Sequence, residues 1–145
     1  MKLNELLGAN LMNDVLCDLF ETYDVDVVFT YDRTHENIKD SYNAEIVDLG
    51  LEFIFDENRN LETLFIKPVN ITTFYPFDFS ELPRFKSKSE AMIFSNNNSI
   101  KITEGKTDFR EKSSDWIRLD YESYSIHYEY VCSELYMITI MSGNS

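Results

Sequence analysis

Apolar residues recur every three or four positions through the first twenty residues, which is the spacing of one face of an α-helix. Gly8 interrupts this stripe, so we expect two short helices rather than one. Asp14, Asp18 and Glu21 fall on the opposite face, where like charges at this spacing repel one another and must face solvent or a cation. The stripe consists of Leu3, Leu6, Leu7, Leu11, Val15, Leu19 and Phe20.

Strand patterns follow this helical opening. Residues 24–31 alternate between apolar and polar, which predicts a half-buried strand with a partly charged outer face. Residues 32–43 are polar and aperiodic, and we expect an acidic loop there. The apolar runs 50–55 and 61–66 flank a polar turn segment, which predicts a β-hairpin, preceded by a further strand at 44–48.

The middle of the chain predicts a loop and then a helix. Residues 68–85 contain all three prolines with aromatic residues between them, a composition that favours an ordered loop over a flexible linker. Ser87 and Glu90 fit a capping box, in which the two side chains satisfy free N–H groups at a helix start. We expect a short helix to about Phe94, ended by the asparagine run at 96–98.

The last third predicts antiparallel strands. Residues 99–103 form a strand pattern before a turn at Glu104 and Gly105, and three successive strands follow at 116–121, 125–131 and 135–141. The last strand is apolar on both faces, so we place it centrally in the sheet. The predicted fold class is α+β: N-terminal helices followed by a mostly antiparallel meandering sheet of six or seven strands, with one inserted short helix. We expect one domain spanning residues 1–145.

Charge changes this picture more than any motif does. The 145 residues carry a net charge of −13. Residues 1–66 hold fifteen acidic and four basic residues, a net charge of −11, so the field is concentrated on one half of the chain. Such self-repulsion destabilises a compact state, and attraction of a basic partner is its simplest use. The absence of a basic stripe argues against direct nucleic-acid binding.

The sequence contains no recognisable motif for catalysis or metal binding. Residues 56–60 resemble the start of a calcium loop, but Leu61 and Lys67 stand where that loop needs Gly and Glu. His127 and Glu129 share a strand face, an arrangement that serves either general-base work or a simple hydrogen bond. We predict no cofactor, no metal and no enzymatic activity.

The cysteines and the N-terminal sequence indicate the cellular compartment of the protein. Cys17 and Cys132 lie in no metal or disulfide pattern, and we predict two buried free thiols. No apolar run approaches the roughly 18 residues of a membrane span, and polar residues interrupt the N-terminal apolar stretch. We therefore expect a cytoplasmic protein with no membrane contact.

Aromatic residues interleaved with the carboxylates predict a protein interface. Buried aromatic anchors, surrounded by charges that steer the encounter, are what a tight interface requires, although charge runs more commonly form a solvated surface. Tyr23, Tyr31, Tyr42 and Phe55 lie among the acidic residues of the first half. The residues predicted to bind a partner are Asp14, Asp18, Asp24, Asp26, Asp32, Glu36, Asp40, Asp56 and Glu57, with Tyr121, Glu122 and Tyr124 as a second cluster.

The strand rhythm and aromatic content of residues 45–141 resemble those of bacterial polymorphic-toxin immunity proteins, including those of contact-dependent growth inhibition systems. The residues that carry this resemblance are the runs 50–56 and 61–66, the segment 115–118 and the segment 124–130 before the closing strand. The resemblance implies a small, acidic, cytosolic protein that neutralises one cognate toxin domain, often a nuclease, by covering its active site or a site beside it, in a 1:1 complex.

Two alternatives remain open at this stage. An acidic chain of this kind is also compatible with a nucleic-acid mimic that inhibits another DNA- or RNA-binding protein. A carboxylate-based, glycosidase-like hydrolase would need two acidic groups that meet only in space, which a sequence does not show.

Overall fold

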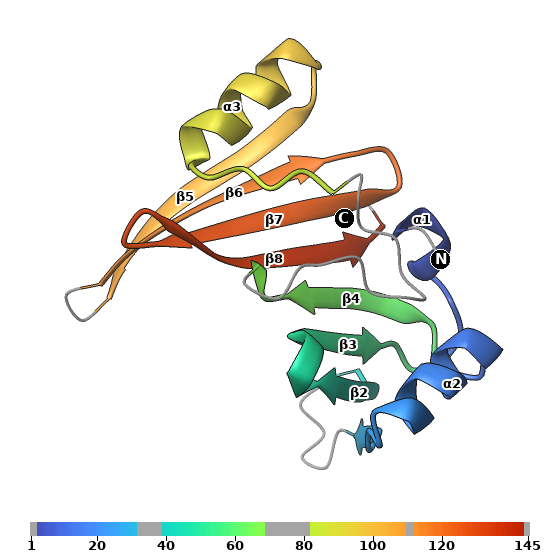
Figure 1. Cartoon of the computed structure of the whole chain (residues 1–145). Coiled ribbons are helices and arrows are strands. Elements are labelled where there is room, and N and C mark those ends of the chain that lie inside the picture. Colours follow the sequence, from blue (N-terminus) through green and yellow to red (C-terminus); the bar gives the residue numbers. More distant parts are fainter. Residues whose placement is uncertain (1–2, 32–38, 69–81, 110–111, 144–145) are drawn as a thin grey trace.

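Eight strands and three α-helices make up the described part of the chain (Figure 1). The computed structural model describes residues 3–31, 39–68, 82–109 and 112–143. The helices are α1 (Leu3–Leu6), α2 (Asp14–Thr22) and α3 (Lys88–Asn97), with a 3₁₀ turn η1 at Val47–Leu49. The strands are β1 (Val28–Thr30), β2 (Ser41–Ile46), β3 (Leu51–Phe55), β4 (Leu61–Ile66), β5 (Lys101–Phe109), β6 (Lys112–Asp120), β7 (Tyr124–Val131) and β8 (Glu134–Ser142).

All eight strands belong to one antiparallel sheet with the order β1-β2-β3-β4-β8-β7-β6-β5. The predicted α+β class is confirmed, as are the β3–β4 hairpin and the central position of the last strand, β8. Because β8 joins β4 to β7, the C-terminal strand connects an N-terminal half of the sheet, β1 to β4, to a C-terminal half, β5 to β7.

Local capping explains where the helices begin. The side chain of Asn13 accepts a hydrogen bond from the Val15 N–H at 2.9 Å and so starts α2. The capping box is confirmed: the Ser87 hydroxyl accepts from the Glu90 N–H at 3.2 Å, and the Glu90 carboxylate accepts from the Lys86 N–H at 2.8 Å. The helix runs three residues further than expected, to Asn97.

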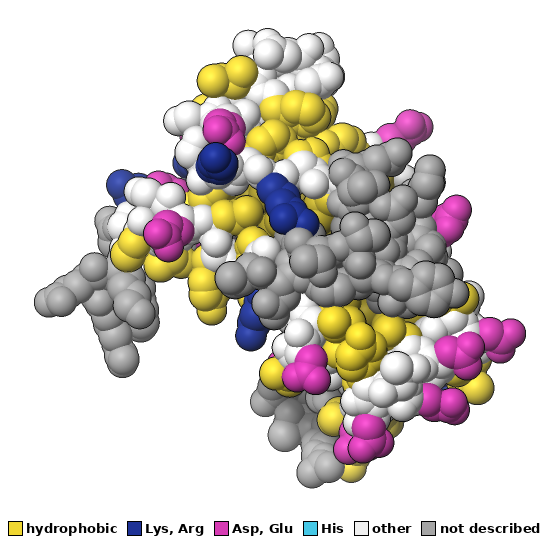
Figure 2. All heavy atoms as spheres, viewed as in Figure 1, with side chains coloured by type: hydrophobic (Ala, Val, Ile, Leu, Met, Phe, Trp, Pro, Cys, Tyr) yellow, Lys and Arg dark blue, Asp and Glu magenta, His cyan; other side chains and the backbone are white. Residues whose placement is uncertain are grey.

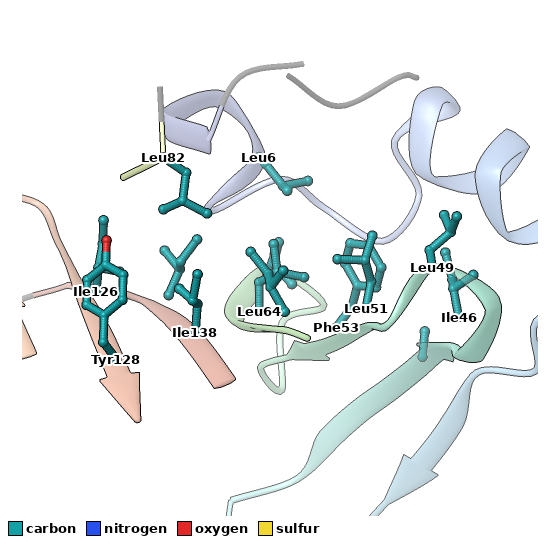
Figure 3. Close-up of a cluster of buried hydrophobic side chains, with 14 of the residues drawn as sticks. Leu6, Ile46, Leu49, Leu51, Phe53, Leu64, Leu82, Ile126, Tyr128 and Ile138 are labelled. Carbon is teal, nitrogen blue, oxygen red and sulfur yellow. The ribbon is translucent and has the colours of Figure 1, made fainter. Parts of the chain in front are cut away.

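The core lies on one face of the sheet. Phe20 of α2 meets Phe53 of β3 edge-on, with ring centroids 5.3 Å apart. Figure 3 shows Leu6 and Leu82 pointing toward Leu64 and Ile138 of the sheet. The opposite face, which we call the open face, is covered by none of the described helices (Figure 1).

Two tyrosines of β7 bind the segment that leads into α3. The Tyr128 hydroxyl donates to the Pro83 carbonyl at 2.9 Å, and the Tyr130 hydroxyl donates to the Phe85 carbonyl at 2.8 Å. The Phe85 ring packs against both Phe94 of α3 and Tyr128. Burial raises the pKa of both tyrosines, so these hydroxyls remain donors at all ordinary pH values.

Several predicted boundaries are wrong. Residues 24–31 form only the three-residue strand β1, and its side chains are exposed rather than half-buried. The predicted loop gives way to β2 at Ser41, and η1 replaces the end of the predicted strand at 44–48. Of the predicted proline-rich loop, residues 69–81 lie outside the described residues.

The turn predicted at Glu104 and Gly105 is also wrong, because β5 continues through both residues. Gly105 pairs with Trp116 of β6, and a Cβ at this position would lie 2.6 Å from the Trp116 indole. Glycine is needed here so that the indole can lie against the neighbouring strand. The prediction that both cysteines are buried fails for Cys132, which is exposed, whereas Cys17 is half-buried.

None of the helices in the described part of the chain is both long enough and apolar enough to cross a membrane.

The tyrosine contacts predict a stability effect. Tyr130→Phe leaves the buried Phe85 carbonyl without its donor, so we expect the free energy of unfolding to fall by about 1–2 kcal/mol. Urea denaturation measures this change. Tyr136→Phe, at an exposed position on β8, is the matched control and should leave stability unchanged. Equal stabilities of the two variants would contradict the role given to the hydrogen bond.

Candidate protein-binding site

The outer face of α2 carries the first part of the predicted acidic surface. Leu16, Leu19 and Phe20 face the core, which leaves Asp14, Asp18 and Glu21 exposed on the opposite side. Asp14 lies in the first turn, where the helix dipole favours a negative charge, but Glu21 lies in the last turn, where it does not. The acidic face therefore lowers the stability of its own helix.

The connection from α2 to β1 extends this surface. Asp24 has a positive φ of 51°, a conformation that Asp tolerates better than most residues, and its N–H bonds to the Glu21 carbonyl at 3.2 Å. Asp24 and Asp26 are both exposed. We call the surface formed by α2, this connection and β1 the acidic corner; its carboxylates are Asp14, Asp18, Glu21, Asp24 and Asp26.

The carboxylates of the acidic corner lack basic partners within the described residues. The ion pairs found among the described residues lie elsewhere: one joins Lys88 of α3 to Glu104 of β5, and the other joins Arg118 to Asp120 within β6. Figure 2 shows acidic side chains gathered at the lower right, over the region that α2 occupies in Figure 1. Asp14, Asp18 and Glu21 thus lie along the outer face of α2, and Asp24 and Asp26 follow directly after the helix, all of them exposed.

Exposed apolar side chains lie at the same corner. Tyr23 is 39% exposed and Tyr31 is 48% exposed. Phe29 of β1 stacks on Tyr31 with centroids 5.7 Å apart and lies 4.8 Å from the ring of Tyr42. Further exposed apolar residues at the corner are Met12, Val27 and Val28.

One predicted anchor is misplaced. Phe55 is completely buried, where its ring meets Phe20 of α2 at 6.3 Å, so it belongs to the core rather than to a surface. Sequence patterns do not single out Phe29, although its place in an apolar strand between acidic segments is the signal that could have found it.

The β3–β4 turn lies beside the start of α2. The Leu11 N–H donates to the Arg59 carbonyl at 2.7 Å, and the Asn10 side chain donates to Asn60 at 3.1 Å. Asp56 serves the turn itself, because its carboxylate accepts the N–H groups of Asn58 and Asn60, both at 2.9 Å. Glu57 is exposed and available to a partner.

Three of the residues predicted to bind a partner do not lie at exposed described positions. Asp40 is half-buried just before β2. Asp32 and Glu36 lie outside the described residues.

The second predicted cluster lies at the same end of the sheet as the β3–β4 turn. Tyr121 and Tyr124 stack with centroids 4.9 Å apart in the β6–β7 turn, next to Glu122. Burial raises the pKa of Tyr121, and Tyr124 raises it further. Three strand spacings separate the two turns in the sheet order, about 14 Å. The structure thus places the β3–β4 turn, with Asp56 and Glu57, and the second predicted cluster on one rim of the sheet.

A hollow of about 580 Å³ lies between these turns on the open face. Arg118 and Asp120, two residues apart on β6, form an ion pair at 2.8 Å in its wall, and Arg118 also donates to the Thr103 hydroxyl at 3.3 Å. Part of the lining therefore consists of groups that are paired with one another. The lining comprises Glu62, Thr63, Lys101, Thr103, Arg118, Asp120, Tyr121, Glu122, Ser125, Met141, Ser142 and Gly143.

His127 and Glu129, which share a strand face, each contact a residue of the neighbouring strand β6. His127 stacks on Trp116 with centroids 5.2 Å apart, and Glu129 accepts a hydrogen bond from the Ser114 hydroxyl at 3.3 Å. Within the described ranges, no three His, Cys, Asp or Glu side chains come together to hold a metal ion.

Comparison with family models, with curated proteins and with solved structures gave no match to this chain.

The environment of His127 predicts a pH dependence. Burial lowers its pKa below 6.5 and Arg118 lowers it further, against an opposing effect of Glu129. The unfolded chain therefore binds the proton more readily than the folded one. The contribution of His127 to stability should be complete above pH 6.5 and should be lost as pH falls toward the folded pKa.

Urea denaturation at several pH values, followed by the emission of the single tryptophan, Trp116, measures this effect. His127→Gln should flatten the dependence between pH 5 and 7 relative to the parent chain. An unchanged profile in that variant would show that another group is responsible.

Proposed function

We propose that this chain is an immunity protein that binds a basic toxin domain, often a nuclease in such systems, and neutralises it by occlusion, with no catalytic activity of its own. The observation that carries the proposal is the acidic corner, where five exposed carboxylates without described basic partners surround exposed aromatic side chains.

Electrostatics favours a basic partner for this surface. Like charges spaced three and four residues apart destabilise α2, and Glu21 opposes the helix dipole as well. A partner with a positive surface relieves both costs on binding. Clustered charges of one sign also raise the rate of encounter with an oppositely charged protein. The substrate cleft of a nuclease is basic for the same reason, because it must attract phosphates.

The aromatic residues of the acidic corner supply apolar contacts, which its carboxylates cannot make. Exposed carboxylates set the association rate, but residence in a complex depends on apolar anchors that exclude water. Tyr23, Phe29 and Tyr31 lie within the acidic corner and are each more than a third exposed. The corner thus combines steering charges and anchors in one place, as a stoichiometric inhibitor requires.

The charge component is tested by reversal of Asp18, Glu21 and Asp26 to lysine. If the proposal is right, the neighbouring gene encodes the toxin, and its toxin domain is the probe, with association followed by stopped-flow fluorescence at low ionic strength. The rate constant should fall by about 10- to 100-fold. Glu21→Lys places a positive charge in the last turn of α2, where the helix dipole favours it. A slower association is therefore not explained by unfolding of the helix.

The matched control reverses Glu45, Asp48 and Glu134, which are also exposed and change the net charge by the same amount. If both triple variants associate at the same rate, overall charge rather than the acidic corner governs binding and the site assignment fails. A neighbouring gene product with an acidic binding domain would contradict the proposed function itself.

The anchor component is tested by Tyr23→Ala. Loss of a central aromatic anchor should cost about 2 kcal/mol of binding free energy, chiefly through faster dissociation, with little change in association rate. Surface plasmon resonance separates the two rates. Tyr136→Ala removes another exposed tyrosine, on β8, and should leave both rates unchanged. A slower association with unchanged dissociation would contradict the anchoring role.

A further inference from the structure

β1 is an edge strand with an unusual composition. It pairs with β2 on one side, and no described residue pairs with its other side. Val28 is 57% exposed and Phe29 is 46% exposed. In an antiparallel strand, alternate residues direct their N–H and C=O groups to either side, so an edge presents unpaired groups to solvent. An apolar edge of this kind is a template for another strand.

The opposite edge of the same sheet is built differently. β5 carries exposed Lys101, Glu104 and Lys106, and charged residues on an edge discourage the addition of a further strand. No charged residue lies within Val28–Thr30. The sheet thus protects one edge with charge and leaves the other edge apolar.

Charge decides which kind of strand can pair with the open edge of β1. A second copy of this chain would bring another net charge of −13 to a corner already lined by Asp24 and Asp26, so self-association is opposed. A strand with basic residues at alternate positions would meet these carboxylates, while its apolar residues would extend the group formed by Phe29 and Tyr42.

We infer that β1 accepts a basic, partly apolar strand of the partner protein as a ninth strand of the sheet. This inference rests on the proposed function in so far as it takes the partner to be basic. Backbone hydrogen bonds to the edge would supply affinity, and the alternation of basic and apolar side chains would supply specificity.

The direct test uses a synthetic octapeptide, acetylated and amidated, that alternates Lys with Val. Its twin is N-methylated at the four central backbone nitrogens, which blocks both edges of the peptide and leaves charge and side chains the same. NMR titration of the full chain should show chemical-shift changes at residues 27–31. The unmethylated peptide should bind at least about tenfold more tightly, because the twin loses the one or two N–H donors that this three-residue strand can accept.

Equal affinities of the two peptides would show attraction by charge alone and would overturn the added strand, while leaving a basic partner possible. Chemical-shift changes centred on β5 or on the open face would also overturn the proposal of an added strand at β1. A failure of the proposed function is recognised separately, because it concerns the toxin domain rather than the peptide.

A pair of variants gives a second test. Val28→Lys and Val47→Lys make the same change at exposed valines, the first on β1 and the second on η1. Val28→Lys should weaken binding of the unmethylated peptide at least about fivefold more than Val47→Lys does. Equal effects of the two variants would contradict the assignment to β1.

Discussion

The packing of Phe20 against Phe53 and Phe55 is the contact on which the acidic corner depends. It holds α2 on the sheet even though the outer face of this helix consists of mutually repelling carboxylates. Apolar burial does not depend on charge and is not screened by salt, so it can stabilise a helix whose electrostatics oppose it. The corner therefore concentrates unfavourable charge on a helix held by apolar packing, and we propose that a cationic partner neutralises this charge.

The remainder of the fold positions this corner and the rim beside it. β8 joins the two halves of the sheet, and the tyrosines of β7 bind the segment that precedes α3 through backbone carbonyls. As a result the β3–β4 and β6–β7 turns, more than sixty residues apart in sequence, lie at one end of the sheet. A partner seated on the acidic corner would approach this rim next.

Features set by neighbouring residues could be predicted from the sequence, and features set by distant ones could not. The hairpin and the capping box are local patterns and are confirmed. Glycine usually marks a turn, so the pattern predicts one at Gly105, but this glycine is required by Trp116 on the next strand. The acidic residues that follow Phe55 predict a surface position for it, whereas its ring is buried against Phe20. The exposure of β1 depends on strand order, which local alternation does not reveal.

The dependence of the association rate on ionic strength tests the central claim most directly. Association between this protein and its proposed toxin partner should slow steeply as salt rises from about 10 to 150 mM, because the Debye length shortens from about 30 to 8 Å over that range. Dissociation should change far less. An association rate that stays constant across this range would contradict the account, since the carboxylates of α2 would then have no part in the encounter.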